Sequence, residues 1–166
     1  MMHAPTELST HFESKARVIL AKYPEIRHEW RAPERPAILH LKFPRVTDSG
    51  FDIDVQVFPV QIFVYAGGAE TQLSITRERP AEVIVQEALG LVRDLLSPAM
   101  RLRVWFASGQ PYKWATEYEA SGRWRRDSQV SLLFYNYFGK RTVWVHQNTV
   151  LPARTQEGLR LESPTG

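Results

Sequence analysis

An alternation of apolar and polar side chains in the first half of the chain constrains the fold most strongly. Three apolar residues in segment 51–58, Ile53, Val55 and Val57, alternate with Asp52, Asp54 and Gln56. Successive side chains of a strand point to opposite faces, so this segment predicts a strand with one buried face and one face in water. The buried face needs a covering layer.

Two segments have the apolar spacing of helices that could form that layer. The first is expected to begin at Thr10, because Thr10 and Glu13 have the form of a capping box, and to end at Pro24. Its apolar stripe follows a 3.6-residue period and comprises Phe12, Ala16, Ile19, Leu20 and Tyr23. The second is expected to open at Pro80 and stop at Ser97-Pro98. Its stripe comprises Ile84, Ala88, Leu91, Val92 and Leu95.

Strands are expected on both sides of the second helix. Those before it are predicted at 38–43, at 51–58 and in a hairpin over 60–75, after a proline-containing connector at 31–37. This hairpin should turn at Gly67-Gly68 and place Ile62 opposite Leu73 and Val60 opposite Ile75 on the buried face. Those after it are predicted at 101–107, 111–120, 123–127 and in a hairpin over 130–146 turning at Gly139-Lys140.

These elements predict an α+β fold: an antiparallel sheet of about seven to nine strands with two amphipathic helices on one face. The expected order is helix, four strands, helix, four or five strands. A length of 166 residues suits one domain, expected over 1–150, with a flexible tail at 151–166. An offset of 70 residues aligns the two halves and would fit an internal duplication. Because the glycine turns do not coincide in that alignment, chance similarity of two hairpins explains it equally well.

Composition narrows the compartment and the chemistry. The absence of cysteine excludes disulfides, a thiol nucleophile and thiolate zinc sites, and favours a reducing compartment. No segment has the ~18 apolar residues of a membrane span, and the first residues lack a signal-peptide core. We therefore expect a cytoplasmic protein. Its net charge of +3 is a mild excess that favours anionic partners only slightly.

The stretch from Gly122 to Val145 is the most unusual, with five Lys or Arg residues and six aromatic residues. Sheets that bind single-stranded nucleic acid combine exposed rings with basic groups. The alternative is a charge-paired hairpin in which rings of this size are buried. A turn at Ser121-Gly122 would pair Glu117 with Arg126, Tyr118 with Arg125 and Glu119 with Trp124.

The hairpin over 130–146 would be apolar on both faces. Its expected pairs are Phe134 with Val145, Asn136 with Val143, Tyr135 with Trp144 and Leu133 with His146. Such strands belong near the centre of a covered sheet, or they present rings to a ligand.

Carboxylates and imidazoles leave open an enzyme with a dispersed site. The candidates are Asp52, Asp54, Glu117, Glu119, His40 and His146. Asp52 and Asp54 share a polar face and could hold a hard cation, but no third ligand accompanies them at a recognisable spacing. His40 and Lys42 are expected across from them as ion-pair partners, and Arg101, Arg103 and Arg126 are candidate salt partners for Glu117 and Glu119. No catalytic, metal or cofactor site is predicted.

The sequence therefore favours a non-enzymatic binding module that recognises a protein or a small ligand through an aromatic and arginine-rich sheet face or cleft. The expected binding residues are Tyr135, Tyr137, Trp144, Trp124, Arg123, Arg125, Arg126, Lys140, Arg141 and His146. Single-stranded nucleic-acid binding is the first alternative and the dispersed enzyme the second. A membrane partner is not expected. Pairing of segment 38–43 as an edge strand would allow a homodimer.

Overall fold

The computed structural model describes residues 6–34, 36–132 and 139–154. In this part of the chain two helices and nine strands follow the order α1, β1 to β5, α2, β6 to β9. The helix bounds are α1 Glu7–Lys22 and α2 Ala81–Leu95. The strand bounds are β1 Glu29–Arg31, β2 Leu39–Phe43, β3 Ile53–Val57, β4 Gln61–Ala66, β5 Ala69–Ser74, β6 Met100–Ala107, β7 Gln110–Ala120, β8 Arg123–Ser131 and β9 Arg141–His146.

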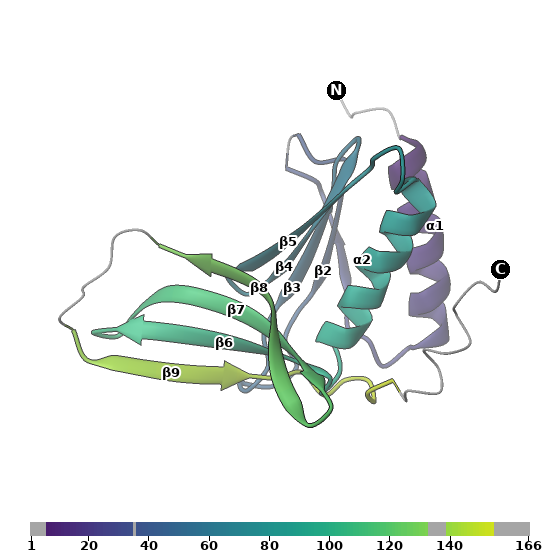
Figure 1. Cartoon of the computed structure of the whole chain (residues 1–166). Coiled ribbons are helices and arrows are strands. Elements are labelled where there is room, and N and C mark those ends of the chain that lie inside the picture. Colours follow the sequence, from purple (N-terminus) through teal and green to yellow (C-terminus); the bar gives the residue numbers. More distant parts are fainter. Residues whose placement is uncertain (1–5, 35, 133–138, 155–166) are drawn as a thin grey trace.

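The strands form two antiparallel sheets, and this confirms the α+β class. The first sheet has the order β1-β2-β3-β4-β5 and the second has the order β8-β7-β6-β9 (Figure 1). The expectation of one sheet was wrong, because within the described residues no strand before α2 pairs with a strand after it. The internal duplication that the sequence left open is not confirmed, since a five-strand meander and the order β8-β7-β6-β9 are different topologies.

Two expectations about the first half also change. A fifth strand, β1, precedes the proline-containing connector and pairs with β2, so segment 38–43 is not an edge of the described sheet. Helix α1 begins at Glu7, one turn earlier than expected, because a different capping box forms there. Thr6 Oγ1 accepts from the Ser9 amide at 3.2 Å and Ser9 Oγ accepts from the Thr6 amide at 2.8 Å. The second helix begins next to the expected position, with Pro80 as its N-cap.

The two helices cover one face of the first sheet (Figure 1). The expected alternation in β3 is confirmed, since Ile53, Val55 and Val57 are all fully buried. These side chains belong to one core with the helix stripes, which contribute Phe12, Ala16, Ile84, Ala88 and Val92. Ile62 pairs with Leu73 as expected. Val60 and Ile75, expected on the buried face, are exposed because they lie just outside β4 and β5.

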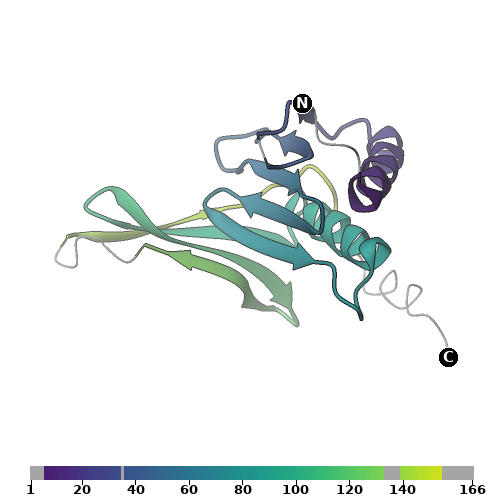
Figure 2. The same cartoon turned by 90° about the horizontal axis from the view of Figure 1, so that it is seen from above.

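The second sheet extends away from both helices and meets the first sheet at the turn between β4 and β5 (Figures 1 and 2). Gly67 has the expected positive φ, and a Cβ on it would lie 2.7 Å from Leu102 Cδ2. A Cβ on Gly68 would lie 2.5 Å from the Trp114 ring. Both distances are shorter than van der Waals contact, so the two sheets pack this closely only because the turn has no side chains.

Asn148, which follows β9 in the sequence, links its own segment to Phe51 and to the end of α2. Its Oδ1 accepts from the Phe51 amide at 3.2 Å, and its Nδ2 donates to the carbonyls of Phe51 at 3.2 Å and Leu95 at 3.1 Å. The side chain is buried, so these bonds replace the hydrogen bonds to water that the backbone groups lose on burial. Leu151 is also buried, and Arg154 forms an ion pair with Asp94 of α2 at 2.9 Å. The segment after β9 therefore packs on α2 as far as Arg154.

The glycine turn yields a stability prediction. Gly68→Ala should lower the free energy of unfolding by about 2 kcal/mol, because the new methyl group overlaps the Trp114 ring. In the Trp114→Ala background, where the ring is absent, the same substitution should cost less than about 0.5 kcal/mol. Urea unfolding of the four proteins measures both values. An equal cost in the two backgrounds would show that the close approach does not limit packing.

Candidate interaction surface on the second sheet

The second sheet has one face turned toward the first sheet and one turned away from it. Leu102 and Trp114, which contact the glycine turn, share the inner face through the pairing of β6 with β7 and of β7 with β8. Alternation puts the neighbouring side chains on the opposite face, which we call the outer face. Among the described residues the outer face includes Arg101, Arg103, Trp105, Lys113, Glu117, Glu119, Trp124, Arg126, Arg141, Val143 and Val145.

Glu117 lies at the centre of the outer face and is only 6% exposed. Its carboxylate accepts from Arg101 Nε at 2.7 Å and lies 3.5 Å from Arg103 Nη1. This arrangement confirms both arginines as its partners. The two charges compensate the burial of the carboxylate, which would be costly without them.

The cations of the outer face also contact its tryptophan rings. The Arg101 guanidinium carbon lies 4.1 Å from the centre of the Trp124 ring, and Lys113 Nζ lies 4.5 Å from the centre of the Trp105 ring. Cation–π contacts of this kind hold both partners in place. The outer face is therefore a pre-ordered array of rings and cations.

The expected register of this hairpin is confirmed, but no ion pair forms between Arg126 and Glu117. Arg126 lies opposite Glu117 in the ladder, as expected. However, Arg101 and Arg103 already occupy the carboxylate, because they approach it from the neighbouring strand β6. Arg123, Arg125 and Arg126 are exposed and have no carboxylate within 4 Å in the described part of the chain.

The outer face consequently has a local excess of positive charge. Five cations, Arg101, Arg103, Lys113, Arg126 and Arg141, share it with two carboxylates, Glu117 and Glu119, when the described residues are counted. This excess is concentrated on one face of four strands. It favours an anionic partner more strongly than the net charge of the chain does.

The structure divides the ten expected binding residues between several places. Trp124, Arg126 and Arg141 lie on the outer face, whereas Arg123 and Arg125 lie on the other side of β8. Trp144 and His146 lie on the inner-face side of β9, and Lys140 comes just before that strand. Tyr135 and Tyr137 lie outside the described residues.

Trp144 does not have the burial expected for a large ring. It is 59% exposed, and its ring lies 6.0 Å from that of Phe106 and 6.3 Å from that of His146. The reason is that β9 pairs with β6 and forms the last strand of the described sheet. The cross-strand pairs expected for hairpin 130–146 involve residues 133–136, which lie outside the described residues.

Sequence reasoning did not select four cationic or aromatic members of the outer face as binding residues, Arg101, Arg103, Trp105 and Lys113, and it also missed Val143 and Val145. The alternation of Arg101, Arg103 and Trp105 with buried Leu102 and Val104 was the signal that could have placed them together.

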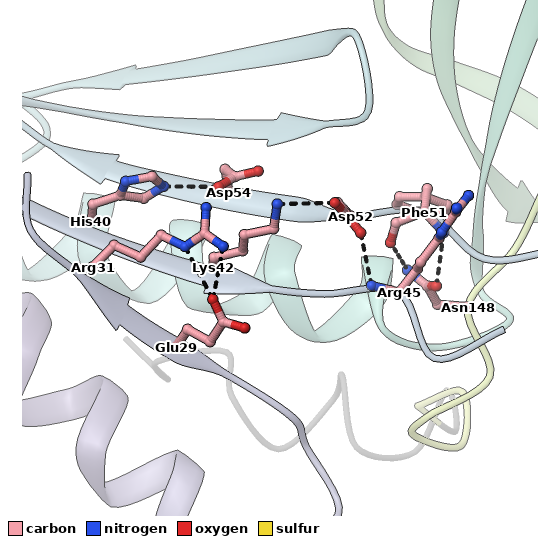
Figure 3. Close-up of polar contacts among 9 residues, drawn as sticks. All are labelled: Glu29, Arg31, His40, Lys42, Arg45, Phe51, Asp52, Asp54 and Asn148. Atoms are coloured by element: carbon pink, nitrogen blue, oxygen red, sulfur yellow. Dashed lines mark hydrogen bonds and ion pairs between the residues drawn. The ribbon is translucent and has the colours of Figure 1, made fainter. Parts of the chain in front are cut away.

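The carboxylates of the first sheet have the structural role expected for them (Figure 3). His40 Nε2 lies 2.8 Å from Asp54 Oδ1, and Lys42 Nζ lies 3.0 Å from Asp52 Oδ2. Burial by itself raises the pKa of Asp52, but the Arg45 amide and the Lys42 ammonium donate to the carboxylate and hold its pKa below the ordinary value. Asp52 is thus an ionised structural partner at neutral pH.

The six candidates for an enzyme site are not gathered in one place. His40, Asp52 and Asp54 lie on the first sheet, and the others lie on the second. Neither a cavity between the helices nor one between α2 and β7 is lined by two of the six. Within residues 6–34, 36–132 and 139–154, no three His, Cys, Asp or Glu side chains are grouped as a metal site would require.

Comparison with known protein families, curated proteins and solved structures finds no match for this chain. Among the described residues, neither helix has the length and apolar character of a membrane span. The chemistry of the surfaces is therefore the basis for any functional conclusion.

The lowered pKa of Asp52 predicts a pH-dependent contribution to stability. A carboxylate whose folded pKa is depressed stabilises the fold above its unfolded pKa of about 3.9, and this stabilisation is lost as the pH falls through the folded value. Asp52→Asn should therefore be less stable than the wild type at pH 7, and the difference should vanish in acid. Thermal unfolding against pH tests this. Asp48→Asn, which removes an exposed carboxylate nearby, should show no such difference.

The central position of Glu117 predicts a second effect. Glu117→Gln should cost about 2 kcal/mol of unfolding free energy, because Arg101 and Arg103 then lack a counter-charge. Glu119→Gln removes an exposed carboxylate from the same face and should stay within about 0.5 kcal/mol of the wild type. Equal effects in urea unfolding would contradict a special role for Glu117.

Proposed function

We propose that the chain is a non-enzymatic interaction module that binds an acidic polypeptide segment on the outer face of the second sheet. The observation that carries this proposal is the composition of that face: five cations and two carboxylates interleaved with Trp105 and Trp124. Tryptophan and arginine are the residues most enriched at the energetic centres of protein interfaces. The absence of cysteine supports a reducing compartment such as the cytoplasm.

Strand β9 supports a polypeptide as the partner. Val143 and Val145 are 50% and 48% exposed and lie on the outer face, next to Arg103 and Trp105 of β6. In the described part of the chain β9 pairs with β6 alone. An extended segment that pairs with β9 and alternates acidic with apolar residues would turn its acidic side chains to the outer face, where the cations lie, and its apolar side chains to the other face of β9, where Trp144 is exposed.

The ordering of the outer face also favours binding. Arg101, Arg103 and Lys113 are already held by Glu117 and by the rings of Trp105 and Trp124. Side chains that are ordered before association lose less conformational entropy when a partner arrives.

Single-stranded nucleic acid is the second candidate. Its support comes from the exposed Arg123, Arg125 and Arg126 and from the exposed ring of Trp144. Bases need open ring faces for stacking. The rings of Trp105 and Trp124 already contact cations of the chain itself, which is why a polypeptide is the preferred partner.

Fluorescence anisotropy tests the proposal with three labelled probes: a peptide of alternating glutamate and valine, a peptide of alternating lysine and valine, and an oligothymidylate. We expect the glutamate peptide to bind most tightly. Lys113→Glu combined with Arg126→Glu should weaken that binding at least tenfold, about 1.4 kcal/mol. Arg27→Glu combined with Arg45→Glu makes the same change in net charge on exposed residues elsewhere and should have a much smaller effect.

Two results would overturn the polypeptide proposal. One is equal binding of the glutamate and lysine peptides, and the other is equal weakening by both double variants. Binding of oligothymidylate alone, lost when Arg123, Arg125 and Arg126 are changed together to alanine and reduced steeply by salt, would instead establish the nucleic-acid function.

A further inference from the structure

A cavity of about 450 Å³ lies between α1 and α2. Leu41 and Phe43 of β2 line its floor, on the side of the first sheet. Apolar side chains of the two helices, of Leu96 just after α2 and of Leu151 after β9 line it as well: Ala16, Ile19, Leu20, Val85, Leu89, Val92, Leu96 and Leu151. This volume lies in the range of small-molecule sites, ~300–1,000 Å³.

The interior of the cavity suits an apolar chain better than water. A buried water molecule needs two to four polar partners. The floor formed by Leu41 and Phe43 provides only apolar side chains, and so do the neighbouring Leu20, Val85 and Leu96. An alkyl chain would gain contact with these side chains without losing hydrogen bonds.

Positive charge gathers around the cavity. Lys15, Lys22, Arg93 and Arg154 line it together with a single carboxylate, Glu82, among the described residues. Arg154 is neutralised by Asp94. Lys15, Lys22 and Arg93 have no carboxylate within 4 Å in the described ranges of the chain, so their charges are available to a ligand.

Arg93 is the cation best held for recognition. Its Nη1 donates to the Tyr23 hydroxyl at 3.4 Å, and its guanidinium carbon lies 5.6 Å from the centre of the Tyr23 ring. Both contacts come from the end of α1, across the cavity from α2. A guanidinium held in this way can bind a carboxylate through two parallel hydrogen bonds.

We infer that this cavity binds a fatty acid, with the alkyl chain between the helices and the carboxylate at Arg93. The apolar lining accounts for the chain and the unneutralised cations account for the headgroup. This site is separate from the outer face of the second sheet, so it does not depend on the function proposed above.

Isothermal titration calorimetry of the full chain tests the inference with octanoate, decanoate and dodecanoate, each below its micelle concentration. Affinity should rise by about fourfold for each methylene added, until the cavity is filled. Dodecyltrimethylammonium, which has the same chain and the opposite charge, should bind at least tenfold more weakly than dodecanoate.

Two substitutions separate the roles of charge and volume. Arg93→Gln should weaken dodecanoate binding at least tenfold, whereas Arg17→Gln, which removes an exposed cation of α1 outside the cavity, should leave it unchanged. Leu89→Trp should abolish binding of all three acids by filling the cavity. Circular dichroism melting confirms that each variant is folded.

The inference is overturned if no fatty acid binds, if affinity does not depend on chain length, or if the cationic detergent binds as well as dodecanoate. Equal losses in Arg93→Gln and Arg17→Gln would also overturn it, because the binding would then follow net charge alone.

Discussion

The close approach of Gly67-Gly68 to the second sheet determines which of that sheet's faces is buried. Leu102 and Trp114 occupy the space that side chains on the turn would need, so the inner face of the second sheet is fixed there. Asn148 holds the same end of the first sheet by binding Phe51, just before β3, and the carbonyl of Leu95 at the end of α2. Because side chains alternate along β6, Arg101 and Arg103 must then point to the outer face. The composition of the outer face is therefore a consequence of how the two sheets are joined.

Competition for carboxylates decides which cations remain available. Glu117 has Arg126 of β8 on one side and the arginines of β6 on the other. Its ion pairs are with Arg101 and Arg103. Those two charges become part of the scaffold, and Arg126 is left exposed. A single buried carboxylate therefore both stabilises the sheet and leaves the neighbouring strand positively charged.

The features that sequence reasoning found depend on neighbours close along the chain or on simple alternation. Burial of Ile53, the turn at Gly67 and the pairing of His40 with Asp54 belong to this kind. The features that it missed depend on choices between competing partners. Thr6 provided a capping box one turn before the expected one, and the division into two sheets depends on which strands pair across long stretches of the chain. The cavity depends on the spacing of two helices, which no local pattern encodes.

Net charge is a poor guide to this molecule, because its charges are neutralised unevenly. On the first sheet Asp52 and Asp54 are committed to Lys42 and His40. On α2 Asp94 is committed to Arg154. These carboxylates lie away from the outer face and from the unpaired cations of the interhelical cavity, so both regions have more cations than carboxylates among the described residues although the net charge of the chain is only +3. Charges exposed to solvent act over about a Debye length, ~8 Å at physiological salt. A partner therefore responds to these local excesses, and the pairing pattern accounts for two anion-attracting regions in a chain that is nearly neutral overall.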